Sequence, residues 1–120
     1  MPWTFSGDRP IYAQLVEQLQ MRIITGTYPP GERLPSVREL ANEAAVNPNT
    51  MQRALAELEK QALVFSQRTS GRFVTEDAAV IQTLRQQLAR EKIRAFLREM
   101  EKLGFSKQDI PLLWEEEEKL

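Results

Sequence analysis

The chain has 120 residues, neither cysteine nor histidine, and a formal net charge of -1 from 16 basic and 17 acidic side chains. Its length suits one domain or a small domain with an appendage, and a hydrophobic share of 42% is enough for a globular core. The missing cysteines and histidines exclude disulfides, thiolate metal sites and the usual general base, so we expect no metal, cofactor or catalytic residue. No apolar run approaches the ~18 residues of a membrane helix and no signal peptide is evident, so we expect a cytoplasmic protein without membrane contact.

The first predicted helix runs from Pro10 to Gly26. Its apolar side chains recur every four residues, the spacing of an amphipathic helix; they are Ile11, Leu15, Leu19 and Ile23. Two prolines and a glycine at positions 29–31 then forbid helix. Residues 32–34 are therefore expected to form only a short extended piece.

Two short helices, each with its own start signal, are predicted next. Ser36 with Glu39 three residues later is the pattern of a capping box, so a helix is expected over residues 37–44. Asn47 followed by Pro48 is a second start, and this helix is expected to reach about residue 61. Two short helices joined by a tight turn are typical of a helix-turn-helix that binds DNA.

The second of these helices has two distinct faces. Residues three and four apart share a face, so Met51, Ala54, Leu55 and Leu58 are predicted to point inward. The opposite face is then polar and is formed by Asn49, Gln52, Arg53 and Ala56. Two β-prone runs, 63–65 and 73–75, flank turn residues 68–71 and predict a hairpin.

A long helix is predicted over residues 78–103, and Gly104 is expected to end it. A further short helix should begin at Ser106 or at Asp109, and the acidic run 115–118 is expected to be a solvated, frayed tail. Two helices beside a domain of about 75 residues bury many large side chains only against a partner or against the domain itself. A dimer interface is therefore predicted at Leu84, Leu88, Ile93, Phe96, Leu97, Met100 and Trp114; a ligand pocket is the alternative, although nothing polar converges there.

These motifs together resemble the winged-helix domain of GntR-type bacterial transcription regulators. The resemblance covers roughly residues 9–75 and rests on Pro10-Ile11-Tyr12, the segment from Gly26 to Ala41, Val46 to Thr50, Leu55 with Leu58, and Gly71 with Phe73-Val74. The remaining residues are similar to the short two-helix C-terminal region of the YtrA-like subfamily, which pairs subunits. Ala62 and Thr69 stand where the family commonly has glycine, and Pro48 stands where relatives often carry arginine.

The resemblance implies a mainly α fold with a small β-hairpin, in which residues 1–77 form a winged helix-turn-helix domain and residues 78–120 a short helical dimerisation region. It also places Arg38 where a side chain reaches guanine edges, and a guanidinium suits that contact because it binds O6 and N7 together. Phosphates are expected at the helix starts, and further DNA contacts at the hairpin tip. The full predicted set is Ser36, Arg38, Asn47, Asn49, Thr50, Gln52, Arg53, Arg68, Ser70, Gly71 and Arg72.

Each of these residues also has a simpler interpretation. Arg38 would only pair with a carboxylate such as Glu43, the polar helix face would only be solvated, and the hairpin tip would be a solubilising turn. The net charge is not basic, although residues 33–72 carry six basic against four acidic side chains. These alternatives remain open at this point.

The function predicted from the sequence is a homodimeric, sequence-specific transcription regulator, acting as a repressor on a palindromic double-stranded DNA operator. Relatives of the YtrA-like type often control neighbouring transporter operons, so a similar target is implied by analogy. The alternative is a winged-helix adaptor that binds protein through the same surface. The sequence identifies neither the operator nor an effector.

Overall fold

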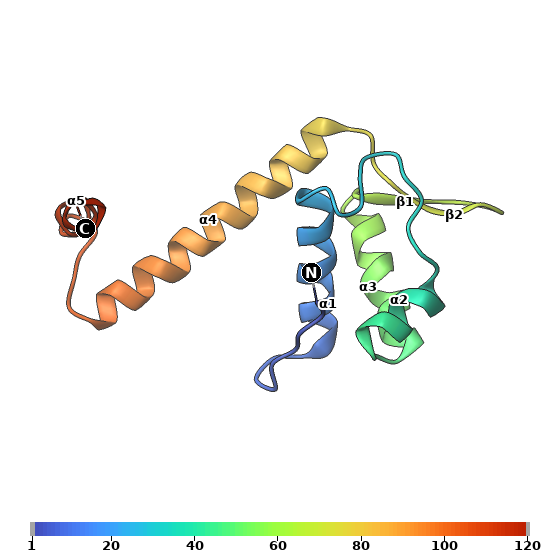
Figure 1. The fold of residues 1–120 in the computed structure, drawn as a ribbon, viewed down its shortest axis with the longest axis horizontal. Coiled ribbons are helices and arrows are strands. Elements are labelled where there is room, and N and C mark those ends of the chain that lie inside the picture. The colour runs from blue at the N-terminus through green and yellow to red at the C-terminus, as the bar shows by residue number, and fades with distance from the viewer. Residues whose placement is uncertain (1, 120) are drawn as a thin grey trace. The chain divides into compact units, whose positions relative to one another are not determined.

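A computed structural model describes residues 2–119. This part of the chain forms five helices and one two-stranded sheet (Figure 1). In chain order they are α1 (Ile11–Ile24), α2 (Val37–Ala44), α3 (Pro48–Lys60), β1 (Val64–Gln67), β2 (Gly71–Val74), α4 (Ala78–Lys102) and α5 (Ile110–Glu118). The predicted fold class, mainly α with a small hairpin, is confirmed. The chain divides into two compact units, one ending at Leu84 and one beginning at Arg85.

The core of the first unit lies where α1 and α2 pack against α3. The predicted apolar stripes supply it, since Leu15 and Leu19 of α1 and Leu40 of α2 have no exposed surface. All four side chains predicted to point inward from α3 are buried; they are Met51, Ala54, Leu55 and Leu58. The α3 helix thus packs against α1, α2 and β1, and its polar side remains outward.

Both predicted helix starts are present. The Ser36 hydroxyl accepts a hydrogen bond from the Glu39 N–H at 3.1 Å, and the Glu39 carboxylate accepts one from the Ser36 N–H. The Asn47 side-chain oxygen accepts a bond from the Asn49 N–H at 2.8 Å, with Pro48 at the first helical position. These caps satisfy N–H groups that have no partner within the helix.

A third extended segment pairs with the hairpin formed by β1 and β2. β1 and β2 are antiparallel, with Val64 opposite Val74 and Gln67 opposite Gly71. The extended piece 32–34 lies along the other edge of β2, because the Leu34 N–H donates to the Arg72 carbonyl at 2.8 Å. The Val74 N–H donates in turn to the Glu32 carbonyl at 2.9 Å. β2 is therefore paired on both sides, and the segment before α2 is fixed to the hairpin.

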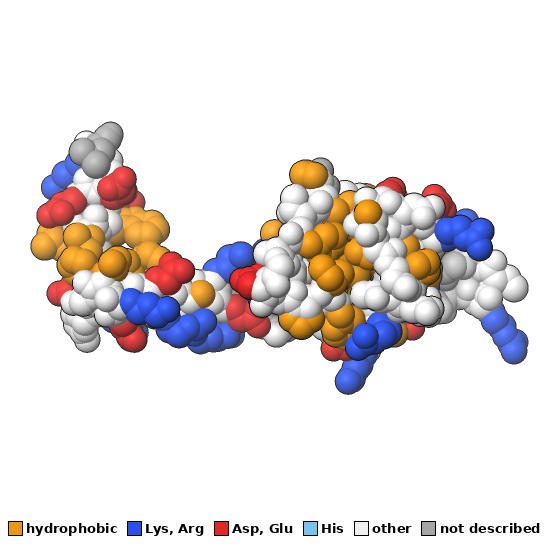
Figure 2. Space-filling model, turned by 90° about the horizontal axis from the view of Figure 1, so that it is seen from below, with side chains coloured by type: hydrophobic (Ala, Val, Ile, Leu, Met, Phe, Trp, Pro, Cys, Tyr) orange, Lys and Arg blue, Asp and Glu red, His pale blue; other side chains and the backbone are white. Residues whose placement is uncertain are grey.

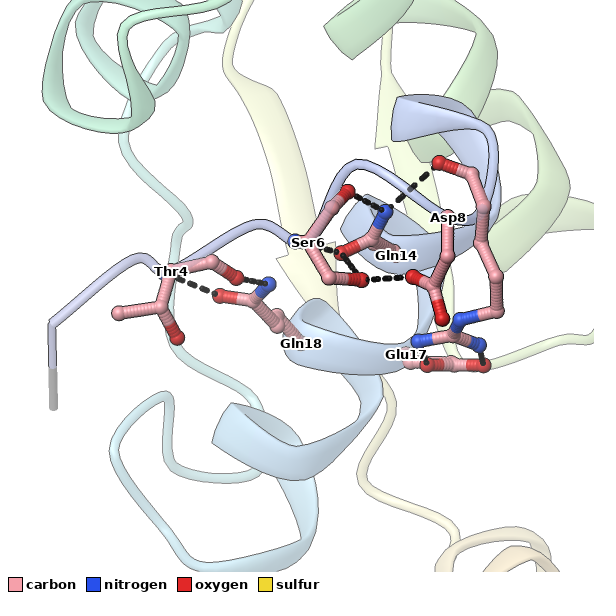
Figure 3. Close-up of polar contacts among 7 residues, drawn as sticks. Thr4, Ser6, Asp8, Gln14, Glu17 and Gln18 are labelled. Carbon is pink, nitrogen blue, oxygen red and sulfur yellow. Dashed lines mark hydrogen bonds and ion pairs between the residues drawn. The ribbon is translucent and has the colours of Figure 1, made fainter.

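Two glutamine side chains of α1 fasten the segment before it (Figure 3). The Gln14 amide donates to the carbonyls of Ser6 and Arg9 at 2.9 and 2.8 Å and accepts from the Ser6 N–H at 2.8 Å. One turn later, the Gln18 amide donates to the Thr4 carbonyl at 2.6 Å and accepts from its N–H at 3.3 Å. Sequence periodicity did not predict this attachment, because it is made by hydrogen bonds between side-chain amides and the backbone of residues up to 14 positions away.

The first two turns of α4 belong to the first unit. Ile81 and Leu84 are only 8% and 7% exposed, so the compact unit extends past residue 77, where the sequence placed the domain boundary. Leu84, predicted at the dimer interface, is already buried within the single chain. The other residues predicted at that interface lie further along α4 and in α5.

The second unit consists of the rest of α4 and of α5. Gly104 ends α4 with φ +93°, as predicted. The side chain of Asp109 accepts bonds from the Ser106 N–H and hydroxyl, at 2.8 and 2.9 Å, and α5 begins directly after it. The acidic residues 115–118 are exposed, as predicted, but they are helical and not frayed. The Trp114 indole N–H donates to the Glu118 carboxylate at 2.9 Å. No helix formed by residues 2–119 is long and apolar enough to cross a membrane.

Candidate nucleic-acid interface

The outward face of α3 presents the polar side chains that the sequence predicted. Asn49, Gln52 and Arg53 are exposed, opposite the buried stripe of the same helix. An Asn or Gln amide carries both a donor and an acceptor, and can bond to both N6 and N7 of adenine. Because α3 is packed only on its inner side, these amides are free to enter a groove.

Arg38 projects from the first turn of α2 and is exposed. Ion pairs are seen at Arg9–Glu17 and Arg72–Glu59, and within residues 2–119 none joins Arg38 to Glu43, the alternative considered from the sequence. Glu39, the nearest acid in sequence, is engaged in the cap of α2. The fork of donors on Arg38 is therefore available to a base or a phosphate.

The two capping side chains keep unused hydrogen-bonding capacity. The Ser36 oxygen accepts from Glu39, but its hydroxyl proton remains able to donate outward. The Asn47 side chain uses its oxygen in the cap, which leaves its NH₂ group for a phosphate. Thr50, also predicted to contact DNA, is half-buried in the first turn of α3.

Arg53 has a neighbour that the sequence did not reveal. Its guanidinium carbon lies 4.6 Å from the centroid of the Tyr12 ring, which belongs to the first turn of α1. A cation over an aromatic face is attracted by the ring quadrupole. No sequence signal links positions 12 and 53, because only the packing of α1 on α3 brings them together.

The hairpin carries fewer free cations than predicted. Arg68, Ser70 and Gly71 are exposed at or beside its tip. The Arg72 Nε, however, lies 2.7 Å from the Glu59 carboxylate of α3, and the Ser66 hydroxyl donates to the same oxygen. Arg72 therefore fastens β2 to α3 and is not a free cation of the hairpin.

These contacts also change the acidity of Glu59. The Ser66 hydroxyl, followed by the Arg72 guanidinium, holds the pKa of the Glu59 carboxyl below its ordinary value. The carboxylate is therefore the favoured form in the folded chain at neutral pH. The hairpin is anchored by a charged pair that is already complete in the absence of DNA.

A second cation, missed by the sequence analysis, lies beside the hairpin. A Cβ added at Gly71 would come within 2.9 Å of the Arg33 Nε, so the Arg33 guanidinium lies directly over this glycine. Gly71 also has φ +95°, a conformation that favours glycine. Arg33 is exposed and is absent from the ion pairs of residues 2–119. Its position depends on the pairing of residues 32–34 with β2, which periodicity does not predict.

Residues 11–74 match the family model described as bacterial regulatory proteins of the gntR family. The chain belongs to this family. It is therefore a transcription regulator with a DNA-binding domain, and Arg38, α3 and the hairpin lie within the matched region.

Similar proteins include two from Bacillus subtilis. The HTH-type transcriptional regulator YhcF is 38% identical over 106 residues, which cover 88% of each chain. The HTH-type transcriptional repressor YtrA is 39% identical over 72 residues, covering 60% of this chain and 55% of that protein.

Two solved structures extend the comparison. A GntR family transcriptional regulator from Listeria monocytogenes has a TM-score of 0.84 and 41% identity, and the match covers 93% of this chain and 98% of that one. The DNA-binding domain of AraR, solved in complex with the operator ORX1, has a TM-score of 0.56 and 30% identity over 60% of this chain and 93% of that one. The winged-helix architecture predicted from the sequence is thus confirmed.

Proposed function

We propose that this regulator binds duplex DNA with α3 in the major groove and reads sequence through Asn49, Gln52 and Arg38. The observation that carries the proposal is the outward polar face of α3, beside an arginine of α2 that has no acidic partner. Amides and guanidinium groups are the side chains that read adenine and guanine edges. AraR, whose domain has the same fold, was solved with an operator, which supports this use of the surface.

The helix starts and the β1–β2 hairpin, residues 64–74, here called the wing, are proposed to hold the DNA backbone. Ser36, Asn47 and Thr50 lie where the positive ends of α2 and α3 and unused donors favour a phosphate. Arg68 and Ser70 at the wing tip suit a minor-groove or backbone contact, and Gly71 lets the chain turn beside them. Arg72 is left out of this set because Glu59 holds it.

We further propose that the second unit pairs two copies of the chain. Large apolar side chains are exposed there: Ile93 is 57%, Phe96 40%, Leu103 71% and Trp114 60% exposed. Figure 2 shows hydrophobic side chains gathered on this part of the chain. The proposed interface comprises Leu88, Ile93, Phe96, Leu97, Met100 and Trp114 from the sequence analysis, with Leu103, Phe105 and Leu112 added from their exposure.

A symmetric pair would bind two inverted half-sites about one helical turn, or ~34 Å, apart. Such a dimer would repress transcription by occupying an operator. The name of YtrA, a transcriptional repressor, supports repression. The subfamily resemblance further suggests a transporter operon as the target of this control.

Selection from a random duplex library tests the proposal. The full chain should enrich an inverted repeat, and its binding should weaken as salt rises, with a log–log slope of about -0.9 per phosphate contacted. A flat salt dependence without an enriched motif would instead favour the protein-binding adaptor.

Arg38 variants test direct readout on the selected operator. Arg38→Ala should lose about 1–3 kcal/mol of operator binding, with a much smaller loss on random duplex. Arg38→Lys is the matched control, since it keeps the charge without the planar fork and should recover backbone attraction but not specificity. Equal losses on both duplexes would remove Arg38 from base readout.

A further inference from the structure

The contact between Arg53 and Tyr12 gives these two residues a more specific role than the polar face of α3 alone suggests. Resting on the proposed DNA binding, we infer that Tyr12 is a positioning residue. It holds the Arg53 guanidinium on the α1 side of α3, where Arg53 contacts a DNA phosphate rather than a base.

The position of Arg53 over Tyr12 supports a phosphate contact for Arg53 and base contacts for the two amides of α3. Arg53 follows Gln52 directly and lies one turn after Asn49, so all three leave the same exposed face of α3. The guanidinium, however, lies over the ring of Tyr12, with its central carbon 4.6 Å from the ring centroid. Its charge is therefore drawn toward α1, to the flank of the face that carries the two amides.

Stacking does not consume the hydrogen-bonding capacity of Arg53. The contact is made with the ring face of Tyr12, and within residues 2–119 no hydrogen bond or ion pair uses the Arg53 guanidinium, so its N–H donors remain available. Arg53 remains exposed and is absent from the ion pairs of residues 2–119. A cation that is held in place and keeps free donors at the edge of a recognition surface is suited to the DNA backbone, which flanks the bases on both sides.

Preorganisation is the physical benefit of Tyr12. A free arginine side chain loses rotamer freedom when it binds a phosphate, and an arginine already resting on a ring has lost part of that freedom beforehand. The half-buried Tyr12 sits on α1, which is packed against α3, so the ring itself is a fixed support. The effect of Tyr12 on DNA should therefore act entirely through Arg53.

The experiment is a double-mutant cycle in the full chain, measured on the selected operator and on random duplex over a salt series. Arg53→Ala should weaken both complexes by the same factor and reduce the salt slope by about 0.9. Tyr12→Leu should weaken both about two- to fivefold, the range expected for an exposed cation–aromatic contact. It should have no further effect when Arg53 is already alanine, and Tyr12→Phe should bind like wild type.

A direct measurement keeps the test independent of folding defects. In NMR spectra of the free protein, the Arg53 side-chain protons should be shifted upfield by the ring, and Tyr12→Leu should abolish that shift while Tyr12→Phe retains it. Equal Arg53 shifts in all three proteins would overturn the stack.

The remaining outcomes separate this inference from the function on which it rests. A loss on the operator alone in Arg53→Ala would assign Arg53 to a base and overturn the phosphate contact. Additive losses in the double variant would overturn the positioning role of Tyr12, while salt-dependent operator binding by wild type would still support the proposed function. Wild-type protein that binds neither duplex would overturn both.

Discussion

Three helices of this chain end with the same hydrogen bonds, but with different residues at the critical position. In each, the residue in the left-handed conformation bonds back three positions and the next residue bonds back five, the pattern of a Schellman motif. Ala45 ends α2, Ala62 ends α3 and Gly104 ends α4, with φ of 56°, 63° and 93°. The alanines therefore adopt a conformation that ordinarily favours glycine.

Ala62→Gly should stabilise the fold. The left-handed conformation costs a non-glycine residue roughly 1–2 kcal/mol, and the greater freedom of glycine in the unfolded chain offsets part of the gain, so a net gain of about 0.5–1 kcal/mol is expected. The Ala62 side chain is exposed, so the substitution removes no buried packing. Urea unfolding at constant m-value measures the change.

Ala56→Gly is the matched control, because Ala56 is also exposed but lies inside α3. There the same substitution should cost about 1 kcal/mol, since glycine disfavours a helix interior. Destabilisation of both variants to the same extent would contradict the strain assigned to Ala62.

The position of the wing relative to α3 depends on the ion pair between Glu59 and Arg72. Its outer edge is paired with residues 32–34, and its β1–β2 face is tied to α3 through Ser66, Arg72 and Glu59. A tip carried on strands fixed in this way can be presented to DNA at a defined place relative to α3. The attachment depends on Glu59 remaining ionised.

Protonation of Glu59 should therefore loosen the wing. Since its folded pKa is lowered from 4.5, its contribution to stability is complete above the unfolded pKa and is lost as pH falls through the folded value. Glu59→Gln should destabilise the protein at pH 7 by about 1 kcal/mol or less, because the pair is partly exposed. As the pH falls through the folded pKa of Glu59, the stability difference between the variant and wild type should shrink, as measured by thermal unfolding at each pH.

Arg68→Gln serves as the control, because Arg68 lies at the exposed wing tip outside the ion pairs of residues 2–119. Its stability should follow that of wild type across the same pH range. A Glu59→Gln protein whose deficit stays constant down to the lowest pH would show that ionisation of Glu59 does not hold the wing.

At the scale of the whole molecule, the two units differ in how much of their apolar surface is buried. The first unit buries its own core as far as Ile81 and Leu84. In the second unit, by contrast, α5 has no buried residue and Trp114 is 60% exposed. Isolated helices with so much exposed apolar surface gain stability by packing against another surface, which is the physical case for a dimer.

Phe96→Glu should therefore convert the protein to a monomer. A carboxylate placed in an apolar interface loses its hydration, and dimerisation should weaken by tenfold or more, on the order of 1.4 kcal/mol or above. Sedimentation velocity at micromolar concentration measures this, and affinity for the full operator should fall while affinity for a half-site is retained.

Gln87→Glu introduces the same charge at an exposed polar position of α4 and should remain dimeric. If Phe96→Glu sediments like wild type, the proposed interface is wrong. The first unit should keep its unfolding transition in both variants, because neither position contributes to its core.

The sequence by itself determined the elements whose causes are local. Apolar spacing located the helices, Ser36 and Asn47 located two helix starts, and the polar side of α3 followed from the position of its apolar side. These predictions succeeded because a helix period and a cap depend on residues a few positions apart.

Only the tertiary structure decided how side chains distant in sequence pair. It placed Arg53 on Tyr12, Arg72 on Glu59 and Arg33 over Gly71, and it placed Leu84 in the core of the first unit. Such pairings depend on how the helices and strands pack together, and an arginine in a sequence carries no sign of the partner it will meet. The proposed recognition surface could therefore be outlined from the sequence, but which of its cations remain free of an acidic partner could not.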